Sequence, residues 1–104
     1  MRTKKKTLIL HLVLTDHWFN QIMIGSKFIE YREIKPHWTR LIWDRRDKIT
    51  HVRFQNGFKK NPPKILFEVR SIRKGKCPVD GWSGTYYQIH FEEMVQESSL
   101  EVQP

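Results

Sequence analysis

Gly25-Ser26-Lys27-Phe28-Ile29-Glu30-Tyr31-Arg32 joins a helical pattern to a strand pattern and so sets the order of the first elements. Side chains alternate from Phe28 to Glu33, which predicts a strand with Glu30 and Arg32 on the same face. Gly25 suits the left-handed residue that ends a helix, and the turn after it delivers Lys27 to the start of the strand. We therefore expect Lys27, Glu30 and Arg32 to converge.

Upstream of this stretch, the segment from Leu8 to Leu14 is apolar on nearly both faces, which indicates a strand in the middle of the fold. Thr15 or Asp16 can cap a short helix that follows it. That helix is expected to carry Phe19, Ile22 and Met23 on its buried face.

Downstream, Pro36 can open a second helix, whose buried stripe is Trp38, Leu41 and Ile42. Strands are predicted at Lys48 to Phe54, Lys64 to Ile72 and Tyr86 to Phe91, with Asn56-Gly57 as a turn and a glycine-rich loop before the last strand. These elements predict an α+β fold, a small and mostly antiparallel β-barrel with two helices packed outside. One domain is expected over residues 1–95, followed by a flexible acidic tail over residues 96–104.

The formal net charge is +8, and the segment 92–104 contributes four glutamates and no lysine or arginine. The rest of the chain carries 19 basic and 7 acidic residues, and such a basic body favours polyanions. The lone Cys77 excludes an internal disulfide framework, and no apolar run is long enough to span a bilayer. We expect a cytoplasmic protein without membrane contact.

No metal or cofactor is predicted from the sequence. The five histidines have neither the paired spacing of a zinc site nor accompanying cysteines. Phosphate-loop and dinucleotide glycine signatures are absent as well.

The stretch from Gly25 to Arg32 resembles the pattern of the ASCH group of the PUA-like superfamily, in which glycine, lysine, glutamate and arginine recur at this spacing. The run Val52 to Phe58 also resembles a strand and turn of bacterial ASCH-like proteins, so the likeness covers roughly residues 8 to 92. It implies a PUA-like β-barrel with a cleft lined by the motif residues. The group is associated with RNA binding, with coactivator-type proteins and with small nucleoside-modifying enzymes.

The main hypothesis is therefore a charged cleft that binds RNA or a nucleotide-like ligand. Lys27 offers an ammonium group to phosphate, and Arg32 offers a planar guanidinium that can make paired hydrogen bonds or stack on a base. Glu30 offers a carboxylate that orients Arg32 or accepts a hydrogen bond from a base amino group. The turn and an aromatic residue of the last strand complete the predicted binding residues, which are Lys27, Glu30, Arg32, Asn56, Gly57, Lys59 and Tyr86. The plainer interpretation of the same charges is a structural ion pair and a solvated turn.

Two other functions stay open. Some small ASCH proteins resemble amidohydrolases that act on an acylated cytidine with a Lys, a Thr and a Glu. Lys27 corresponds to that lysine, but Glu30 occupies the threonine position, and the later glutamate has no clear counterpart. In this reading Lys27 and Glu30 are the candidate catalytic residues. A protein-interaction module is the other alternative, and the oligomeric state is not predicted.

Overall fold

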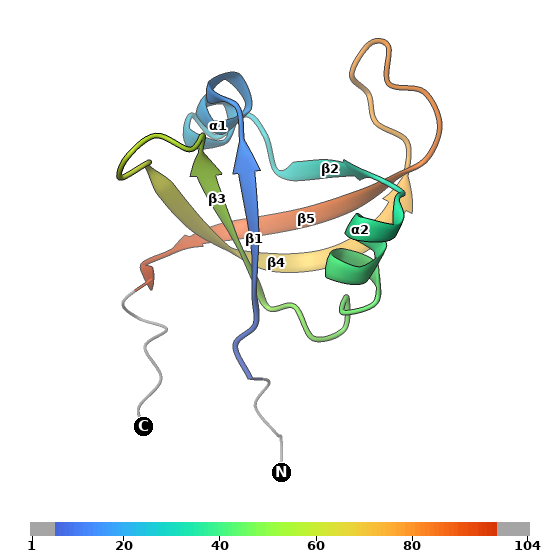
Figure 1. The fold of residues 1–104 in the computed structure, drawn as a ribbon, viewed down its shortest axis with the longest axis horizontal. Helices are drawn as coiled ribbons and strands as arrows, with labels where there is room; N and C mark the ends of the chain where they lie inside the picture. The colour runs from blue at the N-terminus through green and yellow to red at the C-terminus, as the bar shows by residue number, and fades with distance from the viewer. Residues whose placement is uncertain (1–5, 98–104) are drawn as a thin grey trace.

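A five-stranded sheet is the frame of the computed structural model, which describes residues 6–97. The sheet order is β1-β3-β4-β5-β2, in which β1 and β3 are parallel and all other neighbours are antiparallel (Figure 1). Its strands are β1 (Ile9–Leu14), β2 (Ile29–Glu33), β3 (His51–Asn56), β4 (Lys64–Gly75) and β5 (Tyr86–Val95). The helices are α1 (Asp16–Met23) and α2 (Pro36–Trp38), which continues into one π-helical turn, η1 (Thr39–Trp43). The predicted α+β class is confirmed.

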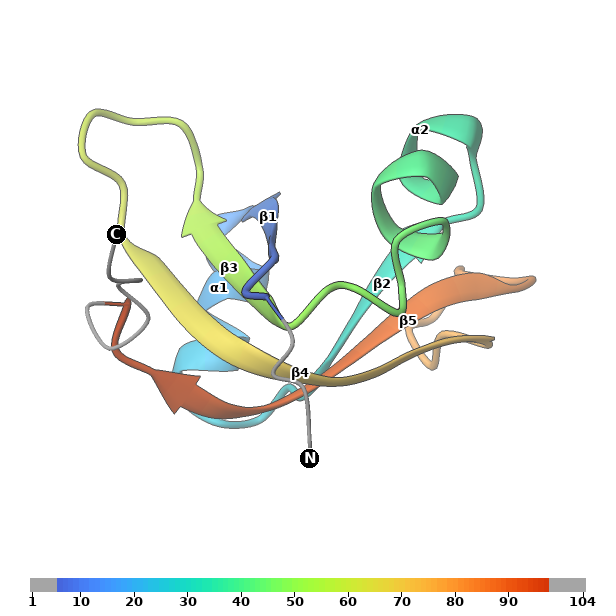
Figure 2. The same ribbon diagram turned by 90° about the horizontal axis from the view of Figure 1, so that it is seen from below.

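The sheet is strongly curled, so the barrel is half closed. Register shifts in β4 between Phe67 and Val69 and between Val69 and Ser71 mark irregular pairing with β5. Such bulges bend a strand and increase its twist. Figure 2 shows the result, with β1 and β3 on one side of the curl and β2 and α2 on the other. The two edge strands, β1 and β2, therefore face each other across an open seam without pairing.

The hydrophobic core lies inside this curl. Phe54, Phe67 and Phe91 meet there with ring centroids 4.8 to 6.0 Å apart. On the α2 side, Ile42 of η1 is fully buried. The Tyr87 hydroxyl hydrogen-bonds to the side chain of Thr39, and its ring stacks on Trp43. These contacts fix the helical turn against β5.

The end of α1 sets the position of β2. Gly25 has a φ of 79° and donates its backbone N–H to Ile22 O, while Ser26 N donates to Gln21 O. This pair of bonds is a Schellman ending, which needs a left-handed residue at the glycine position. The predicted helix end is confirmed, and the turn that follows brings Lys27 to the start of β2. On the helix itself Phe19 and Ile22 are buried as expected, but Met23 is exposed.

The third strand begins later than predicted. The sequence suggested Lys48 to Phe54, whereas β3 spans His51–Asn56. The chain keeps turning after η1, because the backbone N–H groups of Lys48 and Ile49 both donate to Arg45 O. At its other end the strand continues because Asn56 pairs with Leu14 of β1.

The predicted acidic tail lies mostly outside the described residues. Within them, Glu97 forms an ion pair with Arg53 of β3. The hydrogen bond from Arg53 lowers the pKa of the Glu97 carboxyl below its ordinary value. Over residues 6–97 no helix is long and apolar enough to cross a membrane.

Candidate ligand site at the open seam of the sheet

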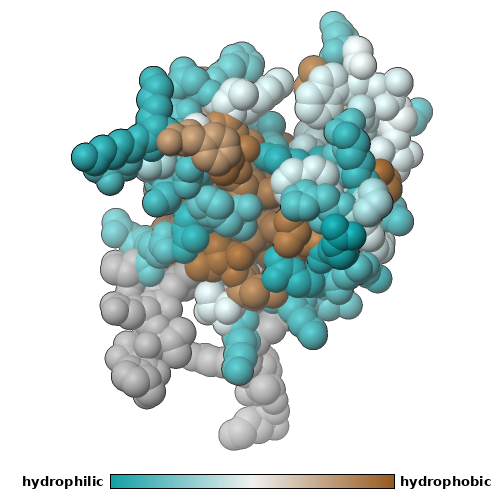
Figure 3. All heavy atoms as spheres, viewed as in Figure 1, coloured by the Kyte–Doolittle hydropathy of each residue, from teal (hydrophilic) through white to brown (hydrophobic). Residues whose placement is uncertain are grey.

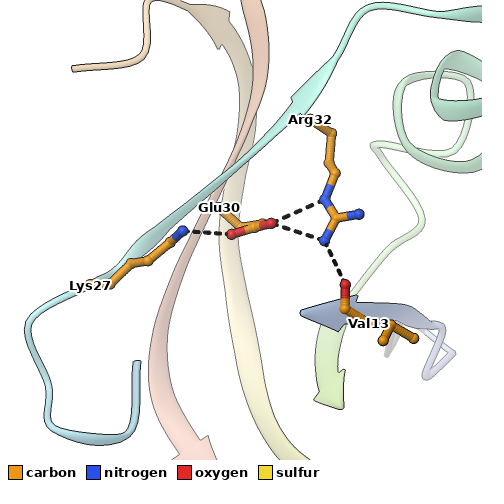
Figure 4. A network of polar contacts seen from close by, with 4 residues as sticks. All are labelled: Val13, Lys27, Glu30 and Arg32. Atoms are coloured by element: carbon orange, nitrogen blue, oxygen red, sulfur yellow. Dashed lines mark hydrogen bonds and ion pairs between the residues drawn. The ribbon is translucent and has the colours of Figure 1, made fainter. Parts of the chain in front are cut away.

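Lys27, Glu30 and Arg32 form one network of charges at the seam (Figure 4). Arg32 Nε and Nη2 lie 3.0 and 2.9 Å from Glu30 Oε2, and Lys27 Nζ lies 2.8 Å from Glu30 Oε1. The side chain of Glu30 is 6% exposed, and those of Lys27 and Arg32 are 15% and 16% exposed. The predicted convergence of the three residues is therefore present.

Arg32 also joins the two edges of the sheet. Its Nη2 donates to the backbone carbonyl of Val13, 3.2 Å away on β1. Because β1 and β2 do not pair, the Arg32 side chain satisfies a backbone carbonyl that has no hydrogen bond from a neighbouring strand. The network is thus a structural contact across the seam as well as a cluster of polar groups.

Each cation of the network lies over a tryptophan ring. Lys27 Nζ is 4.3 Å from the centre of the Trp18 ring, and Arg32 Cζ is 4.8 Å from that of Trp38. Trp18 belongs to the first turn of α1 and Trp38 ends α2, so each edge strand is followed by a helix that supplies one ring. Both distances are within the range of attractive cation–π contacts.

Two polar atoms of the network, Glu30 Oε1 and Arg32 Nη1, differ from the others in their contacts. Glu30 Oε1 is buried and accepts no directed hydrogen bond within the described chain, so Lys27 contacts it only as an ion pair. Arg32 donates from Nε to Glu30 and from Nη2 to Val13, and Nη1 takes no part in either bond (Figure 4). Among the described residues, Glu30 Oε1 is thus contacted only by the ammonium of Lys27, and Arg32 Nη1 is not used in the bonds to Glu30 and Val13.

Two adjoining cavities, of about 350 and 520 Å³, flank Glu30. Together we call them the seam cleft. Hydrophobic residues are exposed in the middle of the face seen in Figure 3, with hydrophilic residues around them. The two cavities have four lining residues in common, which are Trp18, Glu30, Tyr31 and Trp82. Both volumes fall in the range of small-molecule sites, about 300 to 1,000 Å³.

The loop between β4 and β5 contributes the outer wall of the seam cleft. Trp82 is 39% exposed and lies 5.5 Å from Tyr86, ring centre to ring centre. Tyr31 lines both cavities from β2. Burial raises the pKa of Tyr31, with smaller contributions from Cys77 and Glu30, so its hydroxyl remains a hydrogen-bond donor at neutral pH.

The remaining predicted binding residues lie in different places. Tyr86 lines the larger cavity of the seam cleft, whereas Gly57 lines a separate groove beside it. Asn56 donates from its side chain to Asp16 Oδ1 at 3.0 Å, and its backbone N–H donates to Pro63 O. The Gly57 N–H donates to Leu14 O, so both turn amides are engaged within the protein. Lys59 is exposed on the loop that follows.

Sequence reasoning missed Trp18 and assigned Trp38 only to a buried stripe, although both rings line the larger cavity. A signal was present in the repeated dipeptide His17-Trp18 and His37-Trp38, each at the start of a helix that follows an edge strand. In both pairs the rings meet edge to face with centroids 4.6 Å apart.

Within the described residues, no group of three or more His, Cys, Asp or Glu side chains is placed to hold a metal ion. Comparison of the chain with models of known families, with curated proteins and with solved structures finds no match.

Proposed function

We propose that this protein is an ASCH-type domain of the PUA-like superfamily and that it binds RNA through a nucleotide held in the seam cleft. The proposal rests on one observation: the indole rings of Trp18, Trp38 and Trp82 lie around the Lys27–Glu30–Arg32 network. Aromatic faces bind bases by stacking, and charged hydrogen-bonding groups bind base edges and phosphates.

The polar groups fit the parts of a nucleotide. Glu30 Oε1 can accept a hydrogen bond from an amino group of a base when Lys27 turns toward a phosphate. Arg32 offers Nη1 as a donor while its other nitrogens stay bound to Glu30 and Val13. The site therefore has both hydrogen-bonding polarities next to stacking surfaces, which a nucleobase requires.

The charge of the whole chain supports a polyanionic ligand. The net charge is +8, and in the network two cations share one carboxylate, which leaves a formal excess of one positive charge. Phosphate neutralisation by such a surface releases counterions and strengthens RNA binding at low salt.

The same geometry favours binding over amide hydrolysis. Lys27 is held between the Glu30 carboxylate, 2.8 Å away, and the face of Trp18. This arrangement suits an ammonium ion and does not expose a nucleophile. Turnover of an acylated cytidine by the purified protein would overturn this preference.

Replacing Trp82 with alanine is expected to weaken RNA binding about ten-fold or more, because base stacking on one aromatic ring is worth about 1–3 kcal/mol. Trp82 is 39% exposed on the loop between β4 and β5, so the variant should fold normally. The measurement is a titration of fluorescently labelled single-stranded RNA followed by anisotropy.

Trp43→Phe is the matched control, because Trp43 stacks on Tyr87 and lines neither cavity of the seam cleft. Its affinity for RNA should equal that of the wild type. Equal affinities for all three proteins would show that RNA, if bound, does not use the seam cleft.

A further inference from the structure

A second groove adjoins the seam cleft. It has a volume of about 520 Å³, and it shares with the larger cavity of the seam cleft the residues Val13, Leu14, Thr15, Arg32 and Trp38. We call it the side groove. Because Trp38 and Arg32 border both spaces, a ligand in the seam cleft can continue into the side groove without leaving the surface.

Phe58 lines the side groove and is 85% exposed. An exposed phenyl ring contributes little to folding and is accessible to a ligand. The ring faces a space that Trp38 also lines, which places two aromatic surfaces on one groove. Such a pair resembles the stacking platforms on which single-stranded nucleic acids lie.

The loop that carries Phe58 is anchored at its base. Gly57 N donates to Leu14 O at 2.9 Å, and Gln55 Nε2 donates to Gly57 O at 2.6 Å. The Asn56 side chain holds the loop to Asp16 of α1. The exposed ring is therefore presented from a braced turn, which reduces the ordering cost of a contact.

Lys59 and Lys60 follow Phe58 and are both exposed. Neither forms an ion pair with any described residue, in contrast to Lys27 and Lys35, which pair with Glu30 and Glu33. Two unpaired cations beside an exposed ring fit the alternation of phosphate and base along a single strand.

We propose that the side groove is a second nucleotide site, so that the ligand is single-stranded RNA of at least two nucleotides rather than a free nucleotide. This inference rests on the proposed function, since the first nucleotide occupies the seam cleft. The neighbouring base stacks on Phe58 at the mouth of the groove, and Lys59 and Lys60 contact the phosphates that follow.

The test compares a mixed-sequence octaribonucleotide with the four ribonucleoside monophosphates, using the wild type and Phe58→Ala. The wild type is expected to bind the octanucleotide at least about ten-fold more tightly, and Phe58→Ala to weaken that binding about ten-fold by removing one stacking surface. Binding of the monophosphates should be unchanged in the variant.

Charge is tested separately with the double variant Lys59→Gln, Lys60→Gln. The expected result is a slope of log affinity against log salt that is smaller by about 1.4, since each phosphate contact on a single strand contributes about 0.7. The matched control is Lys48→Gln, Lys76→Gln. It makes the same charge change at two exposed lysines that line neither the seam cleft nor the side groove. In the control variant, the slope of log affinity against log salt should decrease by less than it does in Lys59→Gln, Lys60→Gln.

Two negative outcomes are distinguishable. If monophosphates and octanucleotide bind equally well and Phe58→Ala has no effect, the second site is wrong and the proposed function stands. If neither ligand binds at low salt, the proposed function fails and the second site fails with it.

Discussion

Replacing Glu30 with glutamine is expected to lower the free energy of unfolding by about 3 kcal/mol, because it removes the only carboxylate between two largely buried cations. Lys27 and Arg32 would then face each other without compensation, and the amide nitrogen of glutamine cannot accept from either. For a domain of this size such a loss lowers the melting temperature by roughly 15 °C. The measurement is chemical denaturation at neutral pH, followed by tryptophan fluorescence.

Glu33→Gln is the matched control, because Glu33 lies on the same strand and pairs with Lys35 at 3.0 Å. Both of those side chains are 60% exposed, so water screens the pair and its loss should cost less than about 1 kcal/mol. Equal small losses in the two variants would show that the Glu30 network does not hold the seam together.

A large loss of RNA affinity is expected in a variant that keeps the fold and removes the charges of Lys27, Glu30 and Arg32. In Lys27→Met, Glu30→Leu, Arg32→Met, apolar side chains of similar size replace the whole network. Exchange of a buried ion network for apolar groups is often neutral or stabilising. The variant also loses the bond from Arg32 to Val13 O and the two cation–π contacts. The free energy of unfolding should stay within about 2 kcal/mol of the wild type.

The affinity of this triple variant for RNA is nevertheless expected to fall about 100-fold. Each hydrogen bond to a charged group contributes about 1.5–3 kcal/mol, and the variant loses at least two that the ligand would make. Denaturation and RNA titration on the same preparation separate the two quantities. Wild-type affinity in a folded triple variant would mean that the network serves only to close the seam.

The strand part of the site was predictable because it depends on local geometry. Side chains two residues apart on a strand share a face, so the sequence placed Glu30 and Arg32 together. The glycine at the end of α1 likewise fixed the position of Lys27, since a left-handed residue there reverses the chain into β2.

Of the aromatic residues of the site, Tyr86 was predicted and lines the larger cavity, but Trp18 and Trp38 were not predictable from local patterns. Trp18 and Trp38 meet the network because the bulged sheet curls until its two edge strands face each other. That approach depends on pairings between β3, β4 and β5, far along the chain from either tryptophan. For the same reason, the sequence indicated neither the contact of Arg32 with Val13 O nor the engagement of the Asn56 and Gly57 amides.

The structural and ligand-binding interpretations of the charges are compatible. Glu30 holds Arg32 against the edge of β1, and the same carboxylate retains one oxygen without a directed hydrogen bond. A contact that stabilises the seam therefore also orients the groups that a ligand would meet. This explains why a buried charge network is placed at the edge of a cavity rather than in the middle of the core.

If RNA lies against the tryptophans of the seam cleft, the indole N–H resonances of the protein will report the contact. The chain has four tryptophans, and Trp43 lines neither the seam cleft nor the side groove, so it is an internal reference. Adding a mixed-sequence octaribonucleotide to ¹⁵N-labelled protein is expected to shift the indole signals of Trp18, Trp38 and Trp82 and to leave that of Trp43 in place. Saturating RNA that moves none of the three cleft signals, or that moves only the Trp43 signal, would contradict that contact.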